Sequence, residues 1–158
     1  MHRPSRLFAM LVVVSCYVLT SIGIAQPSPR AYVDMAYDSE SELFVLFGGQ
    51  NTIPGDENAE TWVFDPSTAT WEQRLPDPAP PARDAHALAY DAQSDRVVLF
   101  GGAGADDQQF TDLWSYDANT DTWTRHAPAS DAVPPGRVGG RMVYDAESDR
   151  IVLFGGLD

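Results

Sequence analysis

The sequence predicts an all-β protein built from repeated units of four short antiparallel strands. Three related segments carry this prediction: YDSESELFVLFGG begins at Tyr37, YDAQSDRVVLFGG at Tyr90 and YDAESDRIVLFGG at Tyr144. They start 53 and then 54 residues apart, with no insertion inside any of them. A repeat of this length, with several strand patterns in each unit and no sustained helical period, is typical of proteins that pack similar β-sheets side by side.

Each unit is expected to begin with a strand that ends in Tyr-Asp, such as AHALAYD at 85–91. The segment DAQSD is expected to form the next turn, because Asp and Ser side chains can hydrogen-bond the local backbone. The apolar run RVVLF at 96–100 predicts a second strand that is buried on both faces, and a Gly pair ends it. After a longer loop, strands around Trp114 and Trp123 complete the unit, as strands around Trp62 and Trp71 do in the unit before it.

A wider set of residues recurs at fixed places in these units and resembles the kelch repeat. An Arg precedes each Tyr by seven residues, a Gly pair ends each second strand, and two units contain a pair of Trp residues nine positions apart. The recurring residues are Arg30, Arg83 and Arg137; Gly48, Gly49, Gly101, Gly102, Gly155 and Gly156; and Trp62, Trp71, Trp114 and Trp123. The resemblance covers 30–157 and implies a kelch-type β-propeller of four-stranded antiparallel blades, similar to the propeller of galactose oxidase.

Two full blades are expected at about 30–75 and 83–126, and half a blade at about 137–157. Pro-rich linkers separate them, and 26–158 as a whole is expected to be a partial propeller. Two and a half blades fall short of the roughly 4–8 that close a ring. The sequence is therefore interpreted as a fragment whose remaining blades belong to the full-length chain; a ring completed by oligomerisation is the alternative.

The first 25 residues are predicted to be a signal peptide. MHRPSR is basic, LFAMLVVVSCYVLTSIGIA is apolar, and Gly23 and Ala25 place small residues before Gln26, as signal peptidase requires. The protein is therefore expected to be secreted, periplasmic or at the cell surface. Two alternatives stay open: an uncleaved membrane anchor, and lipidation at Cys16 within the lipobox-like VVSC. Because Cys16 is the only cysteine, cleavage after Ala25 would leave no disulfide, thiolate metal site or Cys nucleophile.

The charge balance limits the partners. The chain has 23 acidic and 10 basic residues, and all the basic ones are Arg, so the net charge is −13. Nucleic acid and anionic membranes would repel such a protein. A protein or glycan partner is expected, with no membrane contact beyond the leader.

The loops after the Gly pairs, QNTIPGDENAE and AGADDQQFTD, are the best candidate binding sites, because they should emerge on the same face as the linkers between blades. Their oxygen-bearing side chains could bind Ca²⁺, although neither loop has EF-hand spacing and acidic loops are commonly just solvated. The candidate residues are Asp56, Glu57, Asn58, Glu60, Asp106, Asp107 and Asp112. No other metal and no cofactor is expected.

The repeated Arg and Trp residues favour structural roles. Arg30, Arg83 and Arg137 recur in every blade, which suits the scaffold better than an anion-binding ring around the central channel. Each is expected to pair with an acid or a carbonyl of the neighbouring blade. The available acids are Asp38, Asp91 and Asp145, or Asp65 and Asp117. The Trp residues are expected in the blade core and not on a sugar-stacking surface.

No catalytic constellation is visible in the sequence. The copper site implied by the galactose oxidase resemblance needs two Tyr, two His and a Tyr–Cys crosslink, whereas 26–158 contain only His86 and His126 and no Cys. His86 is expected on an inner strand as a packed residue, and His126 at a blade exit. The sequence therefore predicts an exported binding or interaction module without catalytic activity. The alternative is a carbohydrate-active or oxidase propeller whose active site lies on missing blades.

Overall fold

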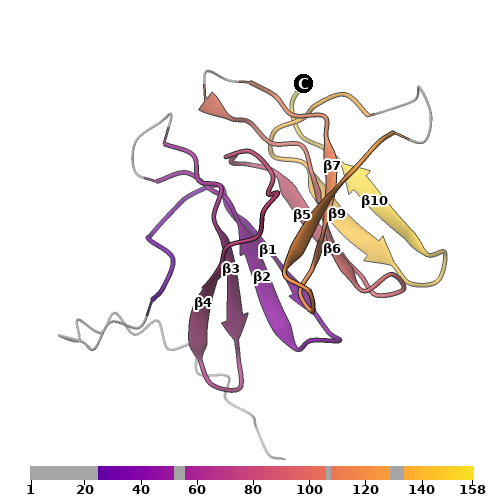
Figure 1. The fold of residues 1–158 in the computed structure, drawn as a ribbon. Helices are drawn as coiled ribbons and strands as arrows, with labels where there is room; N and C mark the ends of the chain where they lie inside the picture. The colour runs from indigo at the N-terminus through magenta and orange to yellow at the C-terminus, as the bar shows by residue number, and fades with distance from the viewer. Residues whose placement is uncertain (1–24, 52–55, 106–107, 129–133) are drawn as a thin grey trace, which may run out of the picture.

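The computed structural model describes residues 25–51, 56–105, 108–128 and 134–158, and within these ranges it contains three antiparallel sheets (Figure 1). Blade one consists of β1 (Asp34–Asp38), β2 (Leu43–Phe47), β3 (Thr61–Asp65) and β4 (Thr70–Arg74). Blade two consists of β5 (Ala87–Asp91), β6 (Arg96–Phe100), β7 (Leu113–Asp117) and β8 (Thr122–His126). Blade three pairs β9 (Arg141–Asp145) with β10 (Arg150–Phe154). The predicted all-β fold of four-stranded antiparallel blades is confirmed.

The predicted leader lies, apart from Ala25, outside the described residues, and so does Cys16. Among the residues that are described, no helix is long and apolar enough to cross a membrane.

A recurring Asp fixes the tight turns that join consecutive strands. Between β5 and β6, the Asp91 carboxylate accepts hydrogen bonds from the backbone N–H groups of Gln93 (3.0 Å) and Ser94 (3.2 Å). The last residue of that turn, Asp95, has a φ of 55°, in the left-handed region that Asp tolerates better than most residues. The Tyr90 hydroxyl donates to the Asp95 carboxylate at 2.9 Å. The same Tyr–Asp bond recurs at Tyr116–Asp121 and Tyr144–Asp149. These contacts explain why Tyr-Asp and a second Asp recur together in the sequence.

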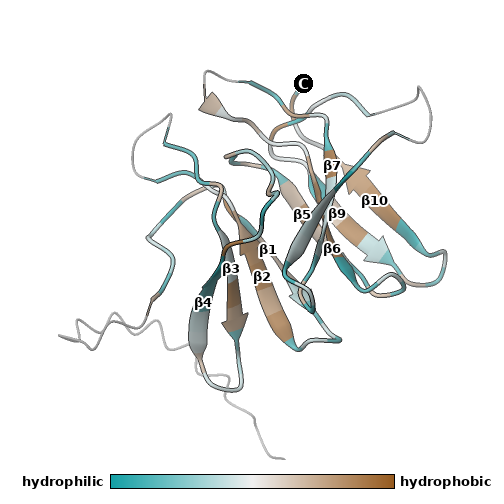
Figure 2. Ribbon diagram, in the orientation of Figure 1, coloured by the Kyte–Doolittle hydropathy of each residue, from teal (hydrophilic) through white to brown (hydrophobic). Residues whose placement is uncertain are grey.

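The core lies between blades one and two. The Trp123 ring on β8 has its centroid 5.2 Å from that of Phe47 on β2, and its Nε1 donates to Thr61 Oγ1 at 2.9 Å. Trp71 holds the corresponding place on β4, but it packs against Phe64 of its own blade at 5.0 Å and stays partly exposed. Figure 2 shows the apolar colour along β2 and β10 and the polar colour along β4 and at the turns. The second strand of each complete blade supplies two fully buried apolar side chains: Val45 and Phe47 on β2, and Val97 and Leu99 on β6.

Backbone hydrogen bonds join neighbouring blades beside the Gly pairs. The Gly49 N–H donates to the Arg83 carbonyl at 2.9 Å, and the Gly102 N–H donates to the Arg137 carbonyl at 3.0 Å. The first glycine of each pair also has no room for a side chain: a Cβ would lie 2.5 Å from the Arg83 carbonyl oxygen at Gly48 and 2.7 Å from the Arg137 carbonyl oxygen at Gly101. The Gly pair thus ends the second strand and lets the next blade approach its backbone closely.

Candidate functional site

A buried arginine holds the base of the long loop in blade two. Arg83 is 0% exposed, and its Nη1 and Nη2 donate to the two carboxylate oxygens of Asp112 at 2.6 and 3.0 Å. Nη1 also donates to the Gly101 carbonyl at 3.1 Å, and the guanidinium lies 3.9 Å from the centroid of the Phe110 ring. Trp114 Nε1 donates to the same Asp112 carboxylate at 2.7 Å. The arginine therefore ties the end of β6 to the start of β7.

Blade one repeats this arginine–carboxylate–tryptophan unit. Arg30 Nη2 donates to Glu60 at 2.5 Å, and its Nη1 donates to the Gly48 carbonyl at 2.9 Å. Trp62 Nε1 donates to Glu60 at 3.0 Å. Trp62 and Trp114 are buried at 5% and 7% exposure, so their rings pack into the blades while their indole N–H groups donate to the acids of the units.

These contacts correct the predicted partners of the arginines. Arg30 and Arg83 pair with an acid of their own blade, and Arg137 donates to the Gly155 carbonyl of its own blade at 2.9 Å. The acids that the sequence suggested accept hydrogen bonds from their own turns, at the ends of the strands away from the Gly pairs; they are Asp38, Asp65, Asp91, Asp117 and Asp145. The usable signal was the acid two residues before the first Trp of each complete blade.

The loops after the Gly pairs and the linkers between blades emerge on one face, as predicted (Figure 1). We call this the loop face; it comprises 50–51, 56–60, 103–105, 108–112 and the linker residues 75–86 and 134–140. Its exposed side chains include Leu75, at 81% exposure, and Tyr32, next to the residue that pairs with the first loop, adds a ring at 65% exposure. Leu75 also borders a shallow pocket of about 330 Å³ that includes Glu60 and Arg74. The opposite face carries the tight Asp-containing turns.

The arginine units remove two acids, Asp112 and Glu60, from the predicted calcium ligands. Burial pushes the pKa of the Asp112 carboxyl upward, but hydrogen bonds from Arg83 and Trp114 and the arginine charge bring that pKa below its ordinary value. Arg30 and Trp62 lower the pKa of Glu60 in the same way against its burial. Both acids are therefore ionised and already neutralised by an arginine, so neither has charge left to balance a bound cation.

Apart from Glu57, whose segment faces that of Asp84, the other predicted ligands do not converge in the described structure. Asp106 and Asp107 lie outside the described residues. Asp56 is exposed, and Asn51 Nδ2 donates to its carboxylate at 2.9 Å. Asn58 uses its backbone, whose N–H donates to the Gly49 carbonyl at 2.8 Å. Within the described ranges, no three His, Cys, Asp or Glu side chains come together in a group that could hold a metal ion.

The structure adds one buried acid that sequence reasoning missed. The Arg83 N–H donates to the Asn58 carbonyl at 3.1 Å, and this bond brings the segment of Glu57 beside that of Asp84. Asp84 is 9% exposed, and burial together with the negative charge of Glu57 raises its pKa above the ordinary value. The residues at the equivalent position of the other blades are apolar, so the repeat gave no signal for it.

His86 is a packed residue that lies just before β5 and not on it, because the positive φ of Ala85 (48°) interrupts the extended chain. The ring is 1% exposed and meets Phe47 edge-on, with 5.7 Å between the centroids. Burial, reinforced by the charges of Arg83 and Arg141, lowers its pKa to about 3, so the ring is neutral. Neither ring nitrogen makes a hydrogen bond of normal geometry with a described residue.

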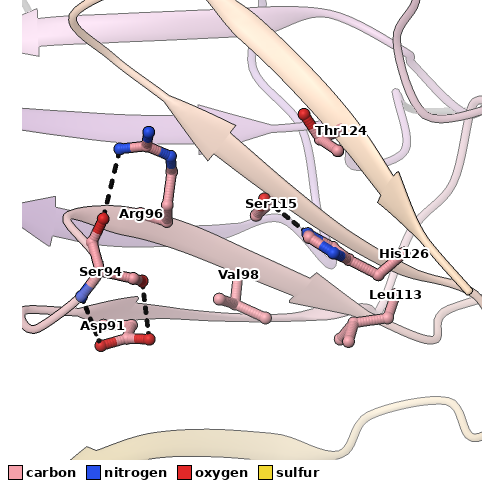
Figure 3. A pocket seen from close by; sticks show the side chains of 8 residues that line it. All are labelled: Asp91, Ser94, Arg96, Val98, Leu113, Ser115, Thr124 and His126. Carbon is pink, nitrogen blue, oxygen red and sulfur yellow. Dashed lines mark hydrogen bonds between the residues drawn. The ribbon is translucent and has the colours of Figure 1, made fainter. Parts of the chain in front are cut away.

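His126 ends β8 and lines an open pocket of about 440 Å³ on blade two (Figure 3). Its Nε2 lies 2.7 Å from Ser115 Oγ, a distance at which a Ser–His pair can exchange a proton. A catalytic pair also needs a third group that orients the imidazole. The acid in the lining, Asp91, instead accepts a hydrogen bond from Ser94 Oγ. Figure 3 shows this carboxylate well apart from the histidine.

The position of this pocket explains its shape. Leu113 in the lining corresponds to Thr61 of blade one, which Trp123 of the neighbouring blade covers. The same face of blade two is only partly covered in the described structure, by β9 and β10. The pocket is therefore an open face of blade two, and its Ser–His pair joins two neighbouring strands; the other described lining residues supply no group that orients the imidazole.

Four-stranded antiparallel sheets, joined through glycine pairs and pinned by a repeated arginine unit, define a repeat protein of the β-propeller class. The family described as "KLHDC2/KLHL20/DRC7 Kelch-repeats domain" matches residues 35–158, and the chain belongs to the kelch-repeat family.

Several kelch-containing proteins are similar to this chain. It is 29% identical over 142 residues to dynein regulatory complex subunit 7 of Chlamydomonas reinhardtii, which covers 88% of this chain and 12% of that protein. It is 34% identical over 125 residues to human kelch domain-containing protein 3, with 73% and 31% covered. It is 33% identical over 115 residues to the human Rab9 effector protein with kelch motifs, with 71% and 29% covered. The chain thus spans between 12% and 31% of the length of these relatives.

Proposed function

We propose that this chain is part of an exported interaction module whose loop face binds a protein partner. The observation that carries the proposal is the construction of that face. The units of Arg30 and Arg83 fix the base of each long loop, whereas the loop residues between them differ in sequence and length. A rigid scaffold that carries variable loops is the usual architecture of a binding surface.

The relatives support an interaction role over an enzymatic one. Their names describe one as a subunit of the dynein regulatory complex and another as an effector of Rab9. A protein partner is favoured over a glycan because Trp62 and Trp114 are buried and hydrogen-bonded to the acids of the arginine units, so neither offers a ring for sugar stacking. The exposed apolar side chains of Tyr32 and Leu75 suit a protein contact instead.

Site-specific photo-crosslinking tests which face binds. A photo-reactive amino acid replaces Gln109, exposed on the loop face, or Gln93, exposed on a turn of the opposite face, in the full-length protein in its own host. We expect a covalent protein adduct from position 109 and none from position 93, identified by mass spectrometry. Adducts from position 93 alone, from neither position, or with a glycan in place of a protein would each reject the proposal.

Export rests on the predicted leader and is tested separately. The N-terminal residue of protein recovered from the extracytoplasmic fraction should be Gln26, because the small residues Gly23 and Ala25 precede it. Retention of the full leader, or a lipid on Cys16, would instead support one of the anchored forms. Recovery only from the cytoplasm would contradict export.

A further inference from the structure

The linker into blade two contains a largely buried aspartate that has no counter-ion among the described residues. Asp84 is 9% exposed, and among the described residues no group donates a hydrogen bond or forms an ion pair with its side chain. Its neighbour Arg83 is committed to Asp112. Burying an ionised carboxylate without a partner is costly, so a protein keeps such a group where something else supplies positive charge.

A second carboxylate lies on the facing segment. The hydrogen bond from the Arg83 N–H to the Asn58 carbonyl (3.1 Å) joins the two segments, so that Glu57 and Asp84 stand on either side of it. Gln50 Nε2 donates to Glu57 Oε1 at 3.4 Å. The negative charge of Glu57 is near enough to contribute to the raised pKa of Asp84. Carboxylate oxygens on two facing segments are the kind of ligand that Ca²⁺ prefers.

The repeat shows that this pair of acids is not needed to join two blades. The junction between blades two and three makes the same backbone bond from its second glycine, at 3.0 Å compared with 2.9 Å. The positions equivalent to Glu57 and Asp84 are there occupied by Gln109 and Val138, which carry no charge. The glycine–arginine bond between blades thus forms without these charges, so the two acids are not needed for it and point to a role beyond the scaffold.

We propose that Glu57 and Asp84 bind a calcium ion at the junction of blades one and two. The ion supplies the positive charge that Asp84 lacks and fastens the loop of blade one to the linker of blade two. Water and backbone carbonyls complete its coordination. With only two charged ligands, the dissociation constant should be roughly 0.1–1 mM, as in extracellular calcium modules. The site does not depend on the identity of the loop-face partner.

Calorimetric titration of the full-length protein with CaCl₂ tests the site directly. We expect saturable binding to the native protein and binding weakened at least about tenfold in Asp84→Asn, since one of its two charged ligands is lost. Calcium should also raise the unfolding temperature of the native protein, because only the folded state holds both acids together. In EDTA, Asp84→Asn should melt above the native protein, because it removes an uncompensated buried charge.

Two further variants make the test specific. Glu57→Gln with Asp84→Val copies the uncharged junction of blades two and three, so it should fold and ignore calcium. Glu147→Gln removes one exposed acid elsewhere and should leave the calcium response unchanged. The proposal is overturned if calcium does not bind, if Asp84→Asn binds it as the native protein does, or if Glu147→Gln loses the response equally. MgCl₂ at the same concentration should give a weaker response, and an equal one would also overturn the assignment to calcium.

Discussion

Replacing Arg83 by Met tests whether the arginine units hold the loop face together. Met fills much of the volume of the arginine stem but donates no hydrogen bond. The substitution leaves the Asp112 carboxylate, at 10% side-chain exposure, with Trp114 as its remaining side-chain donor. It also removes the hydrogen bonds to the carbonyls of Gly101 and Pro81. The main cost is therefore a negative charge that stays buried after its counter-ion has gone.

Breaking a buried ion pair in this way costs about 3–5 kcal/mol of the free energy of unfolding. Arg137→Met is the matched control, because Arg137 donates to the carbonyls of Gly155 and Pro135 but forms no ion pair with a described residue. Two such hydrogen bonds contribute about 1–3 kcal/mol together. The cost at Arg83 should therefore exceed the cost at Arg137 by about 2 kcal/mol or more.

Urea unfolding followed by tryptophan fluorescence measures both costs, and Trp114 and Trp123 report on blade two. If Arg83→Met does not fold, the double variant with Asp112→Asn keeps the test available, because it removes the stranded charge and should recover about 1–3 kcal/mol. The reasoning is refuted if Arg83→Met costs no more than Arg137→Met, or if Asp112→Asn destabilises the Arg83→Met background further.

Three other predictions follow from equivalent positions in different blades. Trp123→Ala should cost about 3–5 kcal/mol in the same urea assay and Trp71→Ala clearly less, because the first ring is buried between blades and the second is partly exposed; equal costs would contradict the packing. Gly101 and Gly155 share a φ of 73°, but a Cβ at Gly101 would lie 2.7 Å from a carbonyl oxygen of blade three, and at Gly155 it would meet nothing. Thermal unfolding should therefore show about 1–2 kcal/mol of left-handed strain for Gly155→Ala and a larger loss for Gly101→Ala. For His86, the folded-state pKa of about 3 lies below the unfolded value of 6.5. Below pH 6.5 the unfolded state therefore binds a proton at this ring that the folded state does not bind. Stability should then fall as the pH drops, by up to about 1.4 kcal/mol per pH unit, and His86→Val should remove this slope between about pH 6.5 and 5. An unchanged slope would show that another group titrates.

The fold was predictable because its determinants are local and repeated. The turn between β5 and β6 needs an acceptor at Asp91, a residue at Asp95 that tolerates positive φ, and the Tyr90 hydroxyl, all within six residues. The Gly pair that follows β6 is equally local in its effect on the chain. Three copies of this arrangement in one sequence leave few alternatives to an antiparallel hairpin.

The partners of the arginines could not be predicted from repetition alone. Arg83 meets Asp112 across 29 residues, through the closure of a loop whose length differs between blades. Asp91 and Asp117 are just as regularly placed in the sequence, so the pattern alone could not decide which acid lies near the guanidinium. The carboxylates of the turns are already used by neighbouring backbone N–H groups, and this use becomes visible only in the three-dimensional structure.

Repetition also indicates where function should be sought in such a chain. Where a contact recurs with the same residues, as at Arg30 and Arg83, it is explained by the need to build each blade. Where the backbone contact recurs but the side chains differ, the need to pack the blades does not explain why one junction keeps the side chain that is less favourable to bury. Asp84 is such a residue, since the glycine–arginine bond recurs at the next junction, where the uncharged Val138 takes its place. The repeated sequence pattern therefore identifies the scaffold, and departures from that pattern at structurally equivalent positions are the better guide to binding.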